Sequence, residues 1–139
     1  MTSTNEIDIR VRYAETDRMG VAWHGHYLSW FEIGRTAWMR DAGCPYGELE
    51  DQGGIFFPVI RVHARYRASA RYDDRLRIKT ELVRVRGARV EFEYEVVRVE
   101  TDQLLATGST EHAATDATGK PCRLPEELRE RLLGQGDPS

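Results

Sequence analysis

The sequence has only two cysteines, Cys44 and Cys122, and no apolar run near the ~18 residues that span a membrane. The cysteines are far apart and form no CxxC unit, so we expect no disulfide framework and a reducing compartment. The first residues lack a basic region followed by an apolar one. We therefore expect no secretory signal, no membrane association and a cytoplasmic protein.

The sequence also lacks an excess of charge of either sign, because the formal net charge is only -3 over 139 residues. This balance gives no overall basic surface for nucleic acid, although a local basic patch remains compatible with it. The composition is that of a globular protein, and no repeat, linker or low-complexity tract divides the chain. We expect a single domain over residues 1–139, with its core at about 6–125 and a C-terminal tail at 126–139.

One long helix is predicted between about Gly25 and Ala42. Gly43 can end this helix in a left-handed conformation, and Pro45 prevents its continuation. A short terminal helix is expected over Leu124–Leu133. The apolar residues of the long helix recur at spacings of three and four, which gives a wide apolar face; they are Tyr27, Trp30, Phe31, Gly34, Ala37, Trp38 and Met39.

Alternating apolar and polar residues predict five strands, one before the long helix and four after it. The first covers 7–13, and the others lie at about 60–70, 75–82, 90–96 and 104–114. Their short turns favour an antiparallel sheet and an α+β fold, and their open edges favour dimerisation by edge-to-edge pairing. The residues expected on one face are Ile60, Val62, Ala64, Tyr66, Ala68, Ala70, Leu76, Ile78, Thr80, Leu82, Val90, Phe92, Tyr94 and Val96.

The segment from Tyr13 to Tyr27 runs from a strand, through a loop with carboxylates, into the long helix. The first N–H groups of a helix lack partners and lie at the positive end of its dipole. Such groups can stabilise the oxyanion of acyl transfer, and a loop carboxylate can attack the carbonyl or activate water. A helix cap or a solvated loop carboxylate would have the same spacing.

This segment carries a recognisable set of residues, namely Tyr13, Thr16-Asp17, Gly20-Val21, His24, Tyr27, and Glu32 with Arg35. In these residues it resembles the signature of the 4-hydroxybenzoyl-CoA thioesterase family of hotdog proteins, especially its bacterial acyl-CoA thioesterase branch. The stretch 62–74 resembles the family's Y-x-x-P-A-x-x-D-D strand, with Ser69 in place of the usual proline. Val85-Arg86-Gly87 matches a third motif, and the resemblance spans about residues 7–125.

The resemblance implies a hotdog fold, in which a curved antiparallel sheet wraps a long central helix, and a homodimer or homotetramer. It implies hydrolysis of an acyl-CoA thioester without a cofactor, with Asp17 as nucleophile or general base. The backbone N–H of His24 matches the group that polarises the thioester carbonyl, and Gly25 is the neighbouring candidate. Tyr27 matches a tyrosine near the site, with a positional role.

Other ionisable residues near the segment have competing interpretations. Glu15 is a rival carboxylate, because in an extended segment it would point to the same side as Asp17. Glu32 and Arg35 are three apart on the helix and are expected to form an ion pair. His24 and His26 do not share a helix face, and the other two histidines lie on distant strands, so no metal site is expected.

Three arginines surround the turn at Gly87, namely Arg84, Arg86 and Arg89. Arginine suits phosphates, so this turn is a candidate site for the CoA phosphates. A solvated hairpin tip is the alternative, and the stretch from Arg61 to Arg71 is a second basic candidate.

Two further functions remain open from the sequence. The first is a hotdog hydratase or dehydratase that acts on acyl thioesters and pairs a carboxylate with a histidine. The second is a protein that binds acyl thioesters without turnover.

Overall fold

The structure is a computed structural model, which describes residues 4–136. The helix end at Gly43 and the turn at Gly87 occur where the sequence predicts them, with φ angles of 80° and 60°. A further turn precedes β3, and Asp73 there has a φ angle of 66°. The strand before the long helix ends at residue 10, earlier than expected. The elements are β1 (Thr4–Arg10), the 3-10 turn η1 (Tyr13–Glu15), α1 (His26–Asp41), α2 (Tyr46–Glu48), the π-helical η2 (Leu49–Gly53), β2 (Val59–Tyr66), β3 (Arg75–Arg86), β4 (Arg89–Arg98), β5 (Gln103–Ala113) and α3 (Glu126–Gly136).

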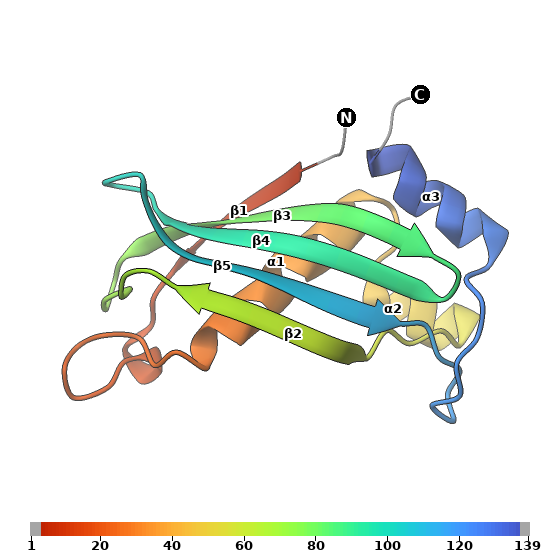
Figure 1. Ribbon diagram of the computed structural model, residues 1–139, viewed down its shortest axis with the longest axis horizontal. Helices are drawn as coiled ribbons and strands as arrows, with labels where there is room; N and C mark the ends of the chain where they lie inside the picture. The colour runs from red at the N-terminus through yellow and green to blue at the C-terminus, as the bar shows by residue number, and fades with distance from the viewer. Residues whose placement is uncertain (1–3, 137–139) are drawn as a thin grey trace.

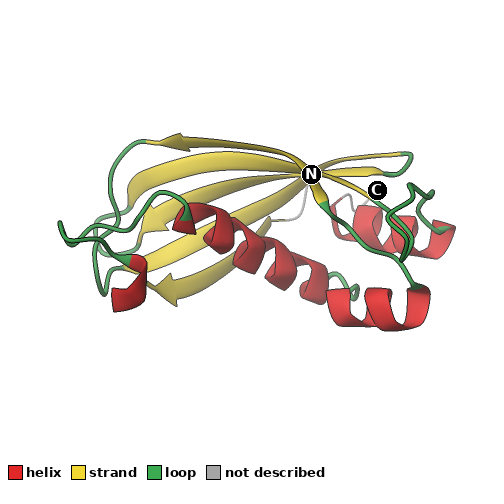
Figure 2. Ribbon diagram, turned by 90° about the horizontal axis from the view of Figure 1, so that it is seen from below, coloured by secondary structure: helices red, strands yellow, loops and turns green. Residues whose placement is uncertain are grey.

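The five strands form one antiparallel sheet in the order β1-β3-β4-β5-β2, so β1 and β2 are its edges. α1 lies across one face of this sheet, and α2 and α3 lie at one end of it (Figure 1, Figure 2). The opposite face of the sheet carries no helix (Figure 2). The prediction of an α+β fold with one long helix against an antiparallel sheet is confirmed.

The core lies between α1 and the inner face of the sheet. Every apolar residue predicted on the helix face is buried, as are the predicted inward positions of β3 and β4. Gly34 lies where α1 approaches the sheet most tightly, because a Cβ there would be 2.4 Å from Thr80 Oγ1 and 2.8 Å from a methyl carbon of Ile78. The helix can therefore approach β3 closely only because residue 34 has no side chain.

The inner face of β2 is the exception to this burial. Val62 lies opposite Thr110 and Tyr66 opposite Ala106, so both face the helix side of the sheet, as predicted. They are nevertheless 46% and 44% exposed, because α1 packs mainly against β1 and β3. The edge strand β2 thus presents an uncovered apolar face beside unpaired backbone groups.

The predicted C-terminal tail begins with a helix that belongs to the core. Leu128 and Leu132 of α3 are buried in the same cluster as the apolar residues of α1. The remaining residues of the tail, 137–139, lie outside the described part of the chain. Within residues 4–136, no helix combines the length and the apolar character needed to cross a membrane.

Candidate active site

The loop between β1 and α1 is a compact, hydrogen-bonded structure. Thr16 and Ala22 form an antiparallel bridge, and the chain reverses over Asp17–Gly20. The N–H of Asp17 donates to Val21 O at 2.9 Å, and the N–H of Gly20 donates to Asp17 O at 3.0 Å. Gly20 has φ of 77°, a left-handed conformation that glycine adopts without strain. This turn fixes the backbone of Asp17.

The side chain of Asp17 is exposed, and only one of its two carboxylate oxygens accepts hydrogen bonds. Its Oδ1 accepts the N–H of Met19 at 2.8 Å and that of Val21 at 3.4 Å. Oδ2 has no partner among the described residues. One carboxylate oxygen therefore orients the side chain, and the other remains available for a ligand.

The same turn occurs a second time in the chain, after β5. Asp116 Oδ1 accepts the N–H of Thr118 at 2.9 Å and that of Lys120 at 3.1 Å. The backbone bonds also correspond, because Asp116 N–H donates to Lys120 O and Gly119 N–H donates to Asp116 O. Gly119 has φ of 87°. The Asp116 turn thus has the hydrogen bonds of the Asp17 turn but does not lead into α1.

Glu15 does not share the side of Asp17, so that expectation is wrong. The segment is not extended there, because Tyr13–Glu15 form the 3-10 turn η1. Glu15 is only 4% exposed, and its carboxylate accepts the N–H of Arg12 at 2.7 Å and the indole N–H of Trp30 at 3.0 Å. Burial raises the pKa of this carboxyl, but the hydrogen bonds from Arg12 and Trp30 outweigh it and leave the pKa below its ordinary value.

The start of α1 leaves two backbone N–H groups free. α1 begins at His26, one residue later than expected, and Gly25 is its N-cap. The N–H of His26 donates to Trp23 O at 3.0 Å, whereas the N–H groups of His24 and Gly25 have no acceptor within residues 4–136. Both lie at the positive end of the α1 dipole, which suits them to a developing negative charge.

The direction of these N–H groups is fixed through the carbonyls of the same peptide units. His24 O accepts the N–H of Tyr27 at 3.2 Å and the hydroxyl of Tyr66 at 3.1 Å. In a planar trans peptide the C=O and the following N–H point in opposite directions. The bonds to His24 O therefore also aim the N–H of Gly25, and the bond to Trp23 O aims the N–H of His24.

Tyr27 is buried, and its hydroxyl links α1 to the backbone of another segment. It is 2% exposed, and its hydroxyl accepts the N–H of Ala70 at 3.0 Å and lies 3.4 Å from Ala68 O. Burial raises the pKa of this phenol, so it stays protonated. Tyr27 thereby ties the first turn of α1 to the segment in which Ser69 replaces the family's proline. This segment was expected to be strand but lies beyond β2, which ends at Tyr66.

A small cavity opens beside this site. It has a volume of about 270 Å³ and is lined by His24, Tyr27, Tyr66, Ser69 and three neighbours. Asp17 and Gly25 lie on the same loop as His24 but do not line the cavity. All four predicted residues, Asp17, His24, Gly25 and Tyr27, thus belong to the loop and first turn that open α1, and His24 and Tyr27 line the cavity there.

The predicted phosphate-binding arginines lie elsewhere. Arg84, Arg86 and Arg89 flank the hairpin between β3 and β4, at the end of the sheet opposite the Asp17 loop (Figure 1). Arg84 and Arg86 are exposed, and Arg89 forms an ion pair with Glu111 at 3.0 Å. Within one chain these arginines and Asp17 therefore do not form one site.

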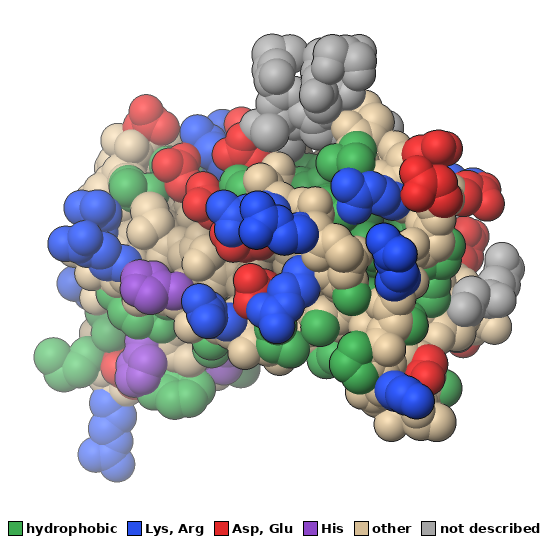
Figure 3. Space-filling model, turned by 45° about the vertical axis from the view of Figure 1, so that its right-hand side comes forward, with side chains coloured by type: hydrophobic (Ala, Val, Ile, Leu, Met, Phe, Trp, Pro, Cys, Tyr) green, Lys and Arg blue, Asp and Glu red, His purple; other side chains and the backbone are tan. Residues whose placement is uncertain are grey.

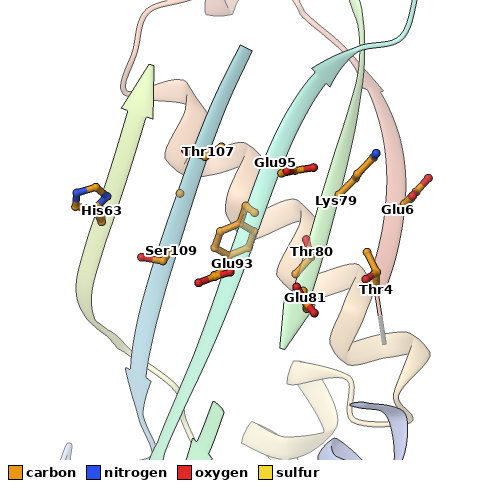
Figure 4. Close-up of a pocket in the computed structure, with 12 residues that line it drawn as sticks. Thr4, Glu6, His63, Lys79, Thr80, Glu81, Glu93, Glu95, Thr107 and Ser109 are labelled. Atoms are coloured by element: carbon orange, nitrogen blue, oxygen red, sulfur yellow. The ribbon is translucent and has the colours of Figure 1, made fainter. Parts of the chain in front are cut away.

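A hollow of about 630 Å³ lies over the sheet and is lined mainly by polar side chains of its outer face (Figure 4). Glu81 and Glu93 face each other across β3 and β4, and Lys79 faces Glu95. Acidic and basic side chains are also interleaved over the surface in Figure 3. The carboxylates make this hollow a poor site for the phosphates of CoA.

The expected ion pair between Glu32 and Arg35 is not formed. Glu32 is exposed, whereas Arg35 is 7% exposed and donates to the hydroxyl of Tyr94 at 3.3 Å. Arg35 and Glu32 instead line a cavity of about 570 Å³, together with Tyr46, Phe57 and other residues. This cavity could not be predicted from the sequence, because its walls come from segments far apart in the chain.

A buried chain of hydrogen bonds continues from Arg35. The hydroxyl oxygen of Tyr94 lies 2.5 Å from Thr110 Oγ1, Thr110 Oγ1 lies 2.8 Å from His112 Nε2, and His112 Nδ1 lies 3.1 Å from the backbone carbonyl oxygen of Phe57. A carbonyl only accepts, so His112 Nδ1–H donates to Phe57, and each earlier hydroxyl donates onward. Burial and the charge of Arg35 lower the pKa of His112 to about 4, so the ring is neutral.

Comparisons with known proteins identify the family. A model of the thioesterase-like superfamily matches residues 11–132. The chain belongs to this superfamily. An acyl-CoA thioesterase, YbgC of Haemophilus influenzae, is 32% identical over 87% of this chain and 88% of its own length. Several relatives are named acyl-CoA thioesterases or acyl-CoA thioester hydrolases, and the chain is a thioester hydrolase.

Solved structures show the same fold. Protein TT1821 from Thermus thermophilus superimposes with a TM-score of 0.88 at 34% identity, over 95% of this chain and 97% of that one. A DHNA-CoA thioesterase from Staphylococcus aureus has a TM-score of 0.86 at 33% identity, over 94% and 91%. The resemblance to the 4-hydroxybenzoyl-CoA thioesterase family and the hotdog fold that it implied are confirmed.

Proposed function

We propose that the protein hydrolyses an acyl-CoA thioester to the free acid and CoA, with Asp17 as nucleophile or general base. The observation that carries this proposal is the juxtaposition on one loop of a free carboxylate oxygen and two unpartnered N–H groups. Asp17 Oδ2 supplies the first, and the backbones of His24 and Gly25 supply the second. The names of the relatives support acyl-CoA as the substrate.

Each group has a role in this reaction. Asp17 attacks the thioester carbonyl, or takes a proton from the water that attacks it. The carbonyl oxygen becomes negative and accepts the N–H groups of His24 and Gly25. When the intermediate collapses, the C–S bond breaks and CoA leaves as a thiolate. If Asp17 is the general base, the thiolate takes up the proton that Asp17 removed from water. If Asp17 is the nucleophile, water hydrolyses the resulting anhydride in a second step and supplies that proton.

A homodimer through β2 would complete the substrate site. The inner face of β2 is apolar and uncovered at Val62 and Tyr66, and its outer edge is unpaired. Pairing two β2 strands antiparallel brings opposite ends of the two sheets together. The arginine hairpin of one subunit, Arg84–Arg89, would then approach the Asp17 end of its partner. This arrangement explains how phosphate-binding and reacting groups at opposite ends of one chain serve one CoA.

The substitution Asp17→Asn tests the assignment. The amide oxygen can still accept the N–H groups of Met19 and Val21, so the turn is retained while the charge is lost. General-base catalysis contributes about 10²–10⁴-fold, so a loss of at least ~100-fold in kcat is expected. Release of free thiol from a panel of acyl-CoAs measures it.

The matched control is Asp116→Asn, because the Asp116 turn has the same two backbone hydrogen bonds to its carboxylate but does not lead into the start of α1. This variant should keep wild-type kcat. Half of the wild-type activity remaining in Asp17→Asn would refute the role of Asp17. Hydration of an enoyl thioester in place of thiol release would indicate the hydratase, and binding without either reaction would indicate a non-catalytic protein.

A further inference from the structure

Residue 25 is glycine for a reason other than backbone conformation. Its φ of -64° and ψ of -25° lie in the right-handed helical region, which any residue adopts. A Cβ at this position would lie 2.1, 2.5 and 2.7 Å from three ring carbons of Trp23. Carbon atoms in contact are about 3.5–4.0 Å apart. Gly25 therefore has no side chain because the indole of Trp23 occupies that space.

Trp23 differs from the other two tryptophans of the chain. Trp30 and Trp38 are 0% and 2% exposed and belong to the core face of α1, whereas Trp23 is 54% exposed. Its ring nevertheless has a defined packing position, which we call its seat. The ring contacts Gly25, and its centroid lies 5.1 and 5.5 Å from those of the His24 and His26 imidazoles. The indole thus sits at the start of α1, beside the free N–H groups.

Building on the function proposed above, we propose that Trp23 is a positioning residue for thioester hydrolysis. Its indole, seated on Gly25, shields the start of α1 from water, so that the N–H groups of His24 and Gly25 meet the thioester oxygen in place of solvent. Hydrogen bonds to a developing oxyanion are stronger where water is excluded. The ring therefore acts through the two backbone donors and takes no part in proton transfer or bond formation.

This proposal predicts that Gly25 and Trp23 form one functional unit. A methyl group at residue 25 forces the ring to retreat by about 1.4 Å, from 2.1 Å to a contact of about 3.5 Å. The ring is the exposed end of a side chain, so it yields more easily than the backbone. Gly25→Ala should consequently lose what Trp23→Ala loses, because each variant removes the indole from its seat.

A double-mutant cycle tests this unit. Displacements of about 1 Å at a catalytic centre cost up to about 10²-fold, so each single variant should lower kcat by about 10–100-fold while KM changes little. The double variant should be no slower than either single one. Trp23→Phe should restore most of kcat, because a smaller ring can keep the seat. Single effects that multiply in the double variant would overturn the proposal.

Tryptophan fluorescence gives a readout that does not depend on activity. Iodide should quench Trp23 but not Trp30 or Trp38, which are buried. Gly25→Ala should increase this quenching because its indole swings into solvent, and Trp23→Phe should abolish it. Unchanged quenching in Gly25→Ala would show that the ring keeps its place, which contradicts the proposal. Gly134→Ala is the matched control, because nothing lies within 4 Å of its added Cβ.

The outcomes also separate this inference from the proposed function. If the wild-type protein releases no thiol from any acyl-CoA, the proposed function fails and this inference fails with it. If the wild-type protein hydrolyses acyl-CoA and Trp23→Ala retains its kcat, only the role of Trp23 is overturned.

Discussion

Replacing Glu15 by glutamine should weaken the fold and not the chemistry. Oε1 accepts the N–H of Arg12 and Oε2 accepts the indole N–H of Trp30. Glutamine keeps one acceptor oxygen and places an NH₂ group where the other was, so one donor loses its partner. Trp30 is 0% exposed, and its N–H cannot turn to water instead. The 75% exposed guanidinium of Arg12 adds little to the ion pair.

The magnitude follows from the charged hydrogen bond that is lost. Such a bond is worth about 1.5–3 kcal/mol, and a buried unpaired donor makes the upper part of this range apply. At about 3 °C per kcal/mol for a chain of this length, a loss of about 2–3 kcal/mol should lower Tm by about 6–9 °C. Thermal unfolding followed by circular dichroism at pH 7 measures this change, with Glu130→Gln on the exposed face of α3 as the control.

The effect should also depend on pH. The folded pKa of Glu15 lies below the ordinary 4.5, so its ionised form stabilises the fold above that pH. This contribution is lost as the pH falls through the folded pKa, and the gap between wild type and Glu15→Gln should then close. If the variant were as stable as wild type at pH 7 but inactive, the structural role would be refuted and Glu15 would become the catalytic carboxylate.

Three further outcomes are expected. Replacing Arg84, Arg86 and Arg89 together with alanine should raise KM for acyl-CoA about ten- to a hundred-fold, because charged hydrogen bonds are worth roughly 1.5–3 kcal/mol. The KM for a truncated pantetheine thioester, which has no phosphates, should not change. Equal losses on both substrates would move the phosphate site to the stretch from Arg61 to Arg71. Sedimentation at micromolar concentration should give at least a dimer, and a species of 16.0 kDa would contradict this. The pKa of His112, lowered to about 4, lies below the unfolded 6.5. Wild-type stability relative to His112→Gln should therefore fall by up to about 1.4 kcal/mol per pH unit between pH 6.5 and pH 4. Parallel pH profiles of the two proteins would rule out a neutral buried ring.

The sequence predicted those parts of the fold in which local periodicity and burial agree. The buried face of α1 and the inward residues of β3 and β4, such as Leu76 and Phe92, followed from spacing alone. Expectations failed where a tertiary contact decides the geometry. Glu15 turns inward because Trp30 offers it a donor, and Arg35 does not pair with Glu32 because Tyr94, on β4, offers it an acceptor.

The location of the candidate site was predictable, whereas its completeness was not. Asp17, His24 and Gly25 lie within nine consecutive residues between β1 and α1, so one loop carries them. The separation of Asp17 from the Arg84–Arg89 hairpin depends on strand order, which no local pattern encodes. The packing of Trp23 against Gly25 was not predicted from the sequence, which shows only that a glycine precedes the helix. The φ of Gly25 is not left-handed in the structure, so the glycine is explained by the space that the indole occupies.

The repeated turn at Asp17 and Asp116 has a consequence for the entropy of catalysis. A free aspartate side chain samples several rotamers and must lose that freedom whenever it reacts. In the Asp17 turn, the N–H groups of Met19 and Val21 already hold one carboxylate oxygen, so this freedom is lost when the chain folds and not at each turnover. The turn at Asp116 shows that the fold uses the same local structure where no helix start is adjacent. An ordinary chain reversal thus delivers a carboxylate in a fixed orientation, and its position next to α1 decides whether that orientation has a chemical use.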